Sequence, residues 1–197
     1  MPSAKFIKSA VFPHEYPPDK GVEIAIAGRS NAGKSSLINL LTGSRIAKVS
    51  STPGKTRLLN FFEMAGGKYT LVDMPGYGFA TRSKGEVEDW QKMIEAYLTS
   101  RQSLKGLILV MDSRREWTED EQMLKNFTDH RGLPFAVVYT KIDKLSKNEL
   151  QKAVVKLKKT SLLETIFPVS ALKRLGHIEF EEWLYQSWVK PFLGKQS

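Results

Sequence analysis

The 197-residue sequence predicts an α/β fold in three layers, with a mostly parallel six-stranded sheet, one antiparallel edge strand and helices on both faces. Apolar strand-like runs alternate with segments of helical periodicity, which is typical of β-α-β units. A glycine-rich turn follows an early apolar run, as in sheets that bind ligands at their carboxyl edge. Hydrophobic residues make up 41% and charged residues 26% of the chain, which indicates a globular protein.

Six segments have the apolar, β-branched or aromatic composition of strands. They are residues 22–27, 58–64, 67–73, 106–111, 134–139 and 165–169. Ala65, Gly66 and Gly67 separate the second segment from the third, and turns of this composition join antiparallel strands. One edge strand is therefore expected to run against the others.

Five segments have helical periodicity. They are residues 34–42, 85–100, 118–130, 147–159 and 177–190. The second carries one apolar stripe at helical spacing, formed by Trp90, Met93, Ile94, Tyr97 and Leu98. We expect this stripe to belong to the core. Trp183, Leu184 and Trp188 are likewise expected to pack the last helix on the sheet rather than to stack on nucleotides.

The length suits one domain, which we place at residues 21–197 after a lead-in of residues 1–20. The chain has no cysteine, which excludes disulfides and cysteine-ligated zinc. It has no apolar run of membrane-spanning length and no signal-peptide pattern, so we expect a cytoplasmic protein without a membrane partner. A monomer is expected, although no pattern in the sequence fixes the oligomeric state.

Residues 28–35 read GRSNAGKS, which matches the phosphate-binding loop GxxxxGK[ST] between an apolar run and a helical segment. Glycines let the backbone turn its N–H groups inward, Lys34 faces the outer phosphates, and the Ser35 hydroxyl suits Mg²⁺. The predicted phosphate-binding residues are Gly28, Arg29, Ser30, Asn31, Ala32, Gly33, Lys34, Ser35 and Ser36.

A second motif, Asp73-Met74-Pro75-Gly76, follows the apolar residues 69–72. Its spacing is that of a DxxG motif, in which the carboxylate supports Mg²⁺ through water and the glycine approaches the γ-phosphate. We therefore predict that Asp73, Met74, Pro75 and Gly76 contact the nucleotide, and that Asp73 is a water-mediated metal ligand.

The polar stretch 50–56 lies between these motifs and is interpreted as a first switch segment. Thr56 is predicted to complete the Mg²⁺ shell while γ-phosphate is present and to release it after hydrolysis. Thr52 is the rival ligand. The nucleotide contacts predicted here are Gly54, Lys55, Thr56, Arg57 and Leu58. Lys34, Thr56 and Gly76 form the predicted catalytic group.

The choice of base is assigned to Thr140-Lys141-Ile142-Asp143, directly after the apolar run 135–139. A carboxylate in the base plane accepts two hydrogen bonds from guanine, whereas adenine offers no such pair of donors on that edge. The TKxD string is weak when taken alone, but the phosphate loop upstream strengthens it. Further contacts to the base are predicted from Val169, Ser170 and Ala171.

The motifs GRSNAGKSSLIN, TPGKTR, DMPGYGFA and TKIDKL occur in this order after a basic lead-in. In this combination the chain resembles, almost end to end, the bacterial EngB family, also called YihA or YsxC, of ribosome-assembly GTPases. The resemblance implies a P-loop GTPase fold, GTP and GDP as ligands, hydrolysis with Mg²⁺, and contact with ribosomal RNA or a large-subunit precursor. It also implies a link to cell division and septation. DNA is not an expected partner.

Tyr77 occupies the position at which Ras-like proteins place a glutamine that orients the attacking water. A phenol suits that task poorly, so we predict slow intrinsic turnover. Tyr77 and Phe79 are expected to be exposed on a second switch loop, residues 74–84, with burial of Phe79 as the alternative. Asn31 either supports K⁺ beside the phosphates or favours the turn.

Net charge is +9 and the isoelectric point is near 9.6, more positive than one nucleotide with Mg²⁺ requires. RNA phosphates are the natural target; the alternative is a solvated basic face. The basic side chains concerned are Arg82, Lys84, Arg114, Arg115, Lys152, Lys156, Lys158, Lys159, Lys173 and Arg174. Residues 151–160 also suit a basic amphipathic helix, although packing on a sheet explains them equally well.

Two functions besides the GTPase switch are considered. An ATP-dependent P-loop kinase is disfavoured by Lys141 and Asp143, and no acceptor-binding segment or lid is evident. A nucleotide-gated RNA-binding scaffold with little hydrolysis is compatible with the missing glutamine.

Overall fold

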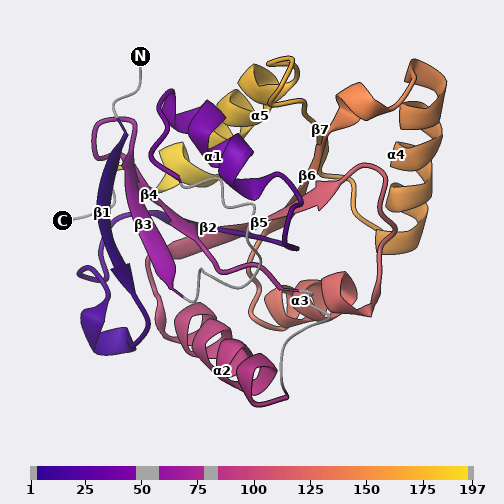
Figure 1. The fold of residues 1–197 in the computed structure, drawn as a ribbon. Helices are drawn as coiled ribbons and strands as arrows, with labels where there is room; N and C mark the ends of the chain where they lie inside the picture. Colours follow the sequence, from indigo (N-terminus) through magenta and orange to yellow (C-terminus); the bar gives the residue numbers. More distant parts are fainter. Residues whose placement is uncertain (1–3, 48–57, 78–83, 195–197) are drawn as a thin grey trace.

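A computed structural model describes residues 4–47, 58–77 and 84–194, and within them confirms the predicted α/β class (Figure 1). One seven-stranded sheet has the order β1-β3-β4-β2-β5-β6-β7. The strands are β1 (Lys5–Ala10), β2 (Glu23–Gly28), β3 (Leu59–Met64), β4 (Tyr69–Asp73), β5 (Leu104–Asp112), β6 (Phe135–Thr140) and β7 (Ile166–Pro168).

The sheet has one strand more than the sequence predicts. β3 pairs antiparallel with both β4 and β1, while β4, β2, β5, β6 and β7 are parallel. The predicted hairpin joins β3 to β4, with positive φ at Ala65, Gly66 and Gly67. The extra strand, β1, lies outside β3 and comes from the lead-in. A bulge between Phe6 and Lys8 interrupts its side-chain alternation, so this segment lacks the sequence pattern that predicts a strand.

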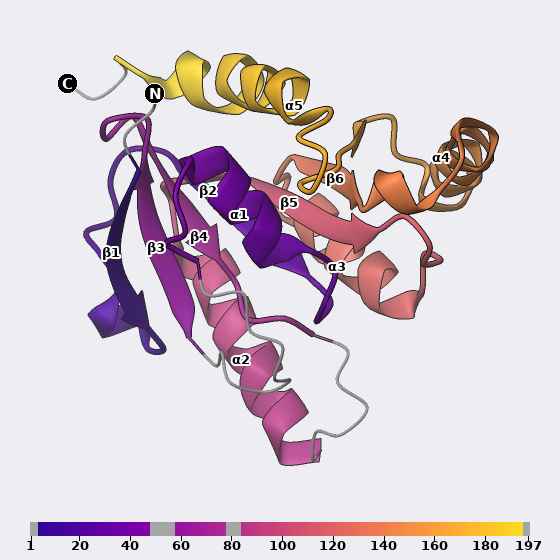
Figure 2. The ribbon, with the colours of Figure 1, turned by 45° about the horizontal axis from the view of Figure 1, so that its top comes forward.

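Helices cover both faces of the sheet, as Figures 1 and 2 show. They are α1 (Lys34–Thr42), α2 (Lys84–Ser100), α3 (Glu119–His130), α4 (Lys147–Ser161) and α5 (His177–Leu184), with 3₁₀ turns at Pro13–Glu15, Ile142–Lys144 and Lys190–Phe192. α1 and α5 contribute to the core on one face, and α2, α3 and α4 contribute to the core on the other. None of the helices in the described ranges is both long and apolar enough to cross a bilayer.

Local sequence explains where the helices begin. Thr118 and Glu121 form a capping box at the start of α3, where the Thr118 N–H donates to the Glu121 carboxylate at 2.9 Å. Ser146 and Glu149 form the corresponding box at α4, and α1 ends at Gly43 in a left-handed conformation.

The apolar stripe of α2 faces the core, as predicted, with Tyr97 completely buried. The last helix departs from its prediction, because α5 ends at Leu184 and continues as the π-helical turn Tyr185–Val189. Pro191 lacks an N–H group and cannot extend an α-helix. The wider turn leaves Trp188 buried against β5, and a Cβ at Gly106 would lie 2.3 Å from its ring.

A buried ion pair fixes the amino end of the sheet. Arg101, which precedes β5, pairs with Glu23 at the start of β2, and the Tyr97 hydroxyl donates to the same carboxylate at 3.1 Å. Arg101 also donates to the Pro17 carbonyl at 3.0 Å and so ties down the lead-in. Burial, followed by the charge of Glu23, raises the pKa of Tyr97 well above its ordinary value.

Candidate functional site

Three of the predicted motifs, at residues 28–35, 73–76 and 140–143, meet at the carboxyl edge of the sheet. The paired registers of the parallel strands place the ends of β2, β4, β5 and β6 side by side. The strand pairs concerned bring Ile26 beside Asp73 and Asp112 beside Thr140. Ligands of open α/β sheets bind at this edge, in the loops that follow the strands.

The phosphate-binding loop runs from the end of β2 into α1. Gly28 packs against β5 so closely that a Cβ would lie 2.6 Å from the Val110 carbonyl oxygen. Asn31 has φ 63° and Gly33 has φ 94°, and α1 begins at the next residue, Lys34. The conformation of Asn31 agrees with the turn that its residue type favours.

Lys34 and Asp73 form an ion pair in which only 11% and 8% of the respective side chains are exposed. Asp73 ends β4, and the next residue, Met74, donates its N–H to Ile26 at 2.9 Å. The two motifs predicted to act on the outer phosphates are therefore adjacent. Ser35, in the first turn of α1, is partly buried.

The oxygen donors at this edge fit Mg²⁺. The Ser35 hydroxyl and the Asp73 carboxylate are hard oxygen ligands, and Mg²⁺ typically combines one or two such groups with waters and substrate phosphates. The described ranges contain no group of three or more His, Cys, Asp or Glu side chains that would form an all-protein metal site.

The segment predicted to select the base, residues 140–143, is hydrogen-bonded to the predicted phosphate loop. The Thr140 hydroxyl lies 2.5 Å from the Ala32 carbonyl, and Lys141 donates from Nζ to the Asn31 carbonyl at 2.6 Å. Lys141 has φ 58°, which turns the chain out of β6 toward this loop. Two segments separated by more than one hundred residues thus form one structural unit.

Asp143 is oriented by the loop that follows β7. The Ser170 hydroxyl donates to Asp143 Oδ1 at 2.5 Å, and this hydrogen bond is the main cause of a lowered Asp143 pKa. Ser170 is fixed in turn by two backbone hydrogen bonds with Leu175, each 3.0 Å long. The carboxylate is therefore held ionised, as acceptance of two hydrogen bonds from guanine requires.

Asp112, at the end of β5, is a further candidate site residue at the carboxyl edge, and no sequence motif indicates it. Its carboxylate accepts from Lys141 at 3.0 Å and from Arg114 at 2.9 and 2.7 Å. Burial raises the Asp112 pKa, but the hydrogen bonds from Arg114 and Lys141 outweigh burial and lower it overall. The only signal for it in the sequence is an acidic residue at the end of a strand.

Tyr77 is buried, so its predicted exposure is wrong. Only 7% of the residue is exposed, and its hydroxyl donates to Glu121 Oε1 of α3 at 3.0 Å. Its carbonyl accepts from the Ser30 N–H at 3.2 Å. Burial, followed by the charge of Glu121, raises the pKa of Tyr77. The phenol turns inward because Glu121 and Arg29 offer it polar partners.

Seven of the predicted residues lie outside the described part of the structure. They are Thr52, Gly54, Lys55, Thr56, Arg57, Phe79 and Arg82.

Other predicted residues lie outside the motif cluster. Leu58 immediately precedes β3 and is exposed. Among the predicted basic residues, Lys156 and Lys158 of α4 pair with Glu116 and Glu164.

Comparison with known proteins agrees with this arrangement. The model of the family described as 50S ribosome-binding GTPase matches residues 23–141. A Bdellovibrio bacteriovorus protein named probable GTP-binding protein EngB is 59% identical over 186 residues, covering 94% of this chain and 92% of that protein. A Clostridium beijerinckii protein of the same name is 46% identical over 184 residues, covering 91% of this chain and 92% of that one.

Two solved structures share the fold. A crystal structure of a probable GTP-binding protein EngB has a TM-score of 0.70 at 24% identity and covers 84% of this chain and 97% of that one. A structure of Era in complex with MgGDPNP and nucleotides 1506–1542 of 16S ribosomal RNA has a TM-score of 0.67 at 25% identity. The match to Era covers 86% of this chain and 57% of that one.

The fold, the carboxyl-edge motifs and the matched family model define a GTP-binding protein that hydrolyses GTP. Within this class, the identity to its relatives over most of its length shows that the chain belongs to the EngB family.

Proposed function

We propose that this GTPase is a molecular switch that acts in assembly of the large ribosomal subunit. The observation that supports its nucleotide chemistry best is the hydrogen-bonded link between the phosphate loop and residues 140–141. The ribosomal part is supported by the description of the family, by the RNA in the related Era structure, and by a net charge of +9. Such a switch works in the cytoplasm and supports cell growth and division.

The proposed nucleotide site uses the backbone N–H groups of residues 29–36 for the phosphates, with Lys34 against the outer ones. Asp143 accepts from the guanine edge, and Ser170 holds that carboxylate while the backbone of Ala171 faces the guanine carbonyl. Gly76 approaches the γ-phosphate. Residues 21–197 form the GTPase domain in this proposal, and the lead-in adds β1 to its sheet.

Mg²⁺ would be held by Ser35 and Thr56 directly and by Asp73 through water. The ion supplies neutralisation of the charge on the β- and γ-phosphate oxygens. The oxygen donors of Ser35 and Asp73 support this assignment, and the MgGDPNP in the Era structure agrees with it. Thr52 is the alternative to Thr56. We further propose that Asn31 helps to hold a K⁺ ion beside the phosphates. Equal hydrolysis rates in KCl and NaCl at matched ionic strength would exclude this role.

A second candidate function is a nucleotide-gated RNA scaffold with little hydrolysis of its own. The specific observation in its favour is the inward phenol of Tyr77, which bonds Glu121 and so is not directed at an attacking water. Slow intrinsic turnover follows for either function, and stimulation by ribosomal particles separates them.

The test is sedimentation of the protein with large ribosomal subunits at physiological salt, with GDP or a non-hydrolysable GTP analogue. We expect cosedimentation that depends on the nucleotide, together with faster GTP turnover in the presence of subunits. Absence of cosedimentation in both nucleotide states would remove the ribosomal part of the proposal. Turnover unchanged by subunits would favour the scaffold.

A further inference from the structure

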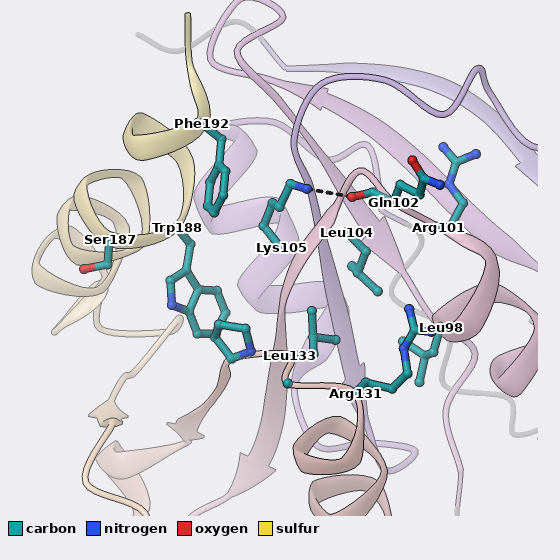
Figure 3. Close-up of a pocket in the computed structure, with 12 residues that line it drawn as sticks. Leu98, Arg101, Gln102, Leu104, Lys105, Arg131, Leu133, Ser187, Trp188 and Phe192 are labelled. Carbon is teal, nitrogen blue, oxygen red and sulfur yellow. Dashed lines mark hydrogen bonds between the residues drawn. The ribbon is translucent and has the colours of Figure 1, made fainter. Parts of the chain in front are cut away.

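A cavity of about 390 Å³ lies at the amino ends of β5 and β6, opposite the edge that carries the nucleotide motifs (Figure 3). Leu98 and Leu104 on its wall belong to the core on the α2 side, whereas Trp188 belongs to the core on the α5 side. The cavity therefore opens where the two cores meet. Its volume falls within the range of roughly 300–1,000 Å³ that is typical of small-ligand sites.

The walls of the cavity combine aromatic and aliphatic surface. Trp188 and Phe192 line one side, Leu98 lies across from them, and Leu104 lies between, as Figure 3 shows. Trp188 is only 7% exposed, because it packs over Gly106 of β5 and beside Trp183. Phe192 and Leu133 are partly exposed and give the cavity the apolar surface on which a small ring can pack.

Positive charge surrounds this apolar surface. Three basic residues, and no acidic ones among the described lining residues, contribute to the cavity. Arg101 is committed to Glu23, and the Lys105 ammonium donates to the Gln102 carbonyl at 2.6 Å and lies 5.2 Å from the centre of the Phe192 ring. The exposed Arg131 guanidinium has no hydrogen bond or ion pair within the described part of the chain.

An apolar, aromatic-walled cavity with cations at its rim suits a ligand that joins a flat ring to an anion. A nucleotide of RNA has this chemistry, since every base has a stackable face and every linkage carries a phosphate. We propose that the cavity binds one unstacked nucleotide of single-stranded RNA, with the base against Phe192 and Leu133, next to the buried Trp188, and the phosphate at Arg131 and Lys105. The identity of the ligand as RNA rests on the proposed ribosomal function.

The position of the cavity has a consequence for binding. Because it lies at the edge of the sheet away from Lys34 and Asp143, RNA in the cavity and guanine nucleotide at the carboxyl edge do not compete. GDP is therefore expected to leave the affinity for a short RNA unchanged within about twofold, if no coupling links the two edges.

The test measures fluorescence anisotropy of a labelled single-stranded octaribonucleotide of uridines with the full chain. Arg131→Glu should weaken binding about tenfold and lower the salt dependence by about one phosphate contact. Lys152→Glu, on exposed α4, changes the net charge equally and should weaken binding less than about threefold. Equal effects of the two substitutions would mean that the net charge of the protein, and not the cavity, determines RNA affinity, and would overturn the proposal.

A second variant tests the cavity without a change of charge. Ser187 is exposed on the rim, so Ser187→Trp should fold normally, fill the cavity and reduce affinity about tenfold. In the wild-type protein, the oligonucleotide should shift the NMR signal of the Trp188 indole N–H. Wild-type affinity in Ser187→Trp, or no shift of that signal, would overturn the proposal.

Two comparisons identify the ligand and separate this inference from the proposed function. Uridine monophosphate or an acidic peptide that shifts the Trp188 signal as strongly as the oligonucleotide, at equal concentration, would overturn RNA as the ligand. Wild-type protein and Arg131→Glu are also sedimented with ribosomal subunits. If the wild type cosediments with subunits but Arg131→Glu does not change the affinity for the octamer, the ribosomal function stands and the proposed role of the cavity is overturned. Octamer binding with a shifted Trp188 signal but no cosedimentation supports the cavity and discards that function.

Discussion

The two edges of the sheet differ in how their charges are arranged. At the carboxyl edge, charged side chains stand where strands end and helical turns begin: Asp73 ends β4, Lys34 begins α1 and Asp143 lies in the 3₁₀ turn after β6. Lys34 pairs with Asp73, and Asp143 accepts a hydrogen bond from Ser170. At the amino edge, Arg101 and Glu23 form a buried pair, while Arg131, beside an apolar cavity, has no ion-pair partner among the described residues. One edge carries the motifs that are predicted to bind phosphates, whereas the other edge is held together by a buried ion pair and opens into a cavity.

The two edges therefore have different roles in the molecule. Positive φ at Gly33, Asn31 and Lys141 allows the carboxyl-edge loops to bring backbone groups toward a ligand. The pair of Arg101 with Glu23 holds three segments together, because it also engages the lead-in. Substitutions at the first edge should therefore change nucleotide chemistry, and those at the second should change stability.

The largest expected effect is the loss of guanine affinity in Asp143→Asn. Two hydrogen bonds to a charged acceptor are weakened or lost, which corresponds to about 3–6 kcal/mol, or more than a hundredfold in affinity. Calorimetry with GDP measures the effect, and ADP, which we expect to bind weakly to both proteins, serves as the internal control. GDP affinity within threefold of wild type would show that another group selects the base.

The counterpart at the amino edge is Arg101→Met. Removal of one partner from a buried ion pair leaves Glu23 uncompensated, and the free energy of unfolding should fall by about 3–5 kcal/mol. Urea denaturation measures this fall. Arg45→Met, at an exposed arginine, is the control and should change stability by less than about 0.5 kcal/mol. A parallel loss of GDP affinity by folded Arg101→Met would break the separation between the two edges.

Lys34→Ala should lower single-turnover GTP hydrolysis about 10²–10³-fold, which is about 3–4 kcal/mol of barrier. The ammonium is the positive charge predicted to face the outer phosphates, and Arg29, the other basic residue of the loop, is paired with Asp120. Lys147→Ala, at an exposed lysine of α4, should leave the rate unchanged. A loss below tenfold would move the catalytic role away from Lys34.

The fold was predictable where local sequence determines local structure. The boundaries of α1 match the prediction, because Gly33 and Gly43 mark its two ends by their conformations. The extra strand β1 was missed because its bulge disrupts the alternation on which strand recognition depends. The continuation of α5 as a π turn depends on the fit of Trp188 over Gly106, which is a tertiary contact.

The site residues also fall into two groups, those that a local motif predicts and those that only tertiary structure brings together. The residues of the phosphate loop and Asp143 stand in contiguous motifs with a chemical reason for each position, so the sequence alone predicts them. Asp112 pairs with Lys141 because the register of β5 and β6 places the ends of the two strands side by side, and no sequence motif indicates this contact. The cavity at the amino edge is assembled from residues near 100, 131 and 190, and its character appears only when these segments are brought together.

The smallest effect on stability is expected from Tyr77→Phe, which tests the hydrogen bond between Tyr77 and Glu121 of α3. The substitution keeps the ring but removes one hydrogen bond to Glu121, which is 1% exposed and also lies 3.5 Å from Arg29 Nε. The free energy of unfolding should fall by about 1–2 kcal/mol. Because the phenol points into α3, intrinsic GTP hydrolysis should change less than about threefold.

Urea denaturation and single-turnover hydrolysis measure the two quantities on the same protein. Tyr185→Phe is the matched control, since the Tyr185 hydroxyl makes no hydrogen bond within the described residues and the ring keeps its contact with Lys68. A tenfold loss of hydrolysis with unchanged stability would mean that the phenol of Tyr77 leaves Glu121 during catalysis. The carboxyl edge would then include α3 as a moving part rather than as a support.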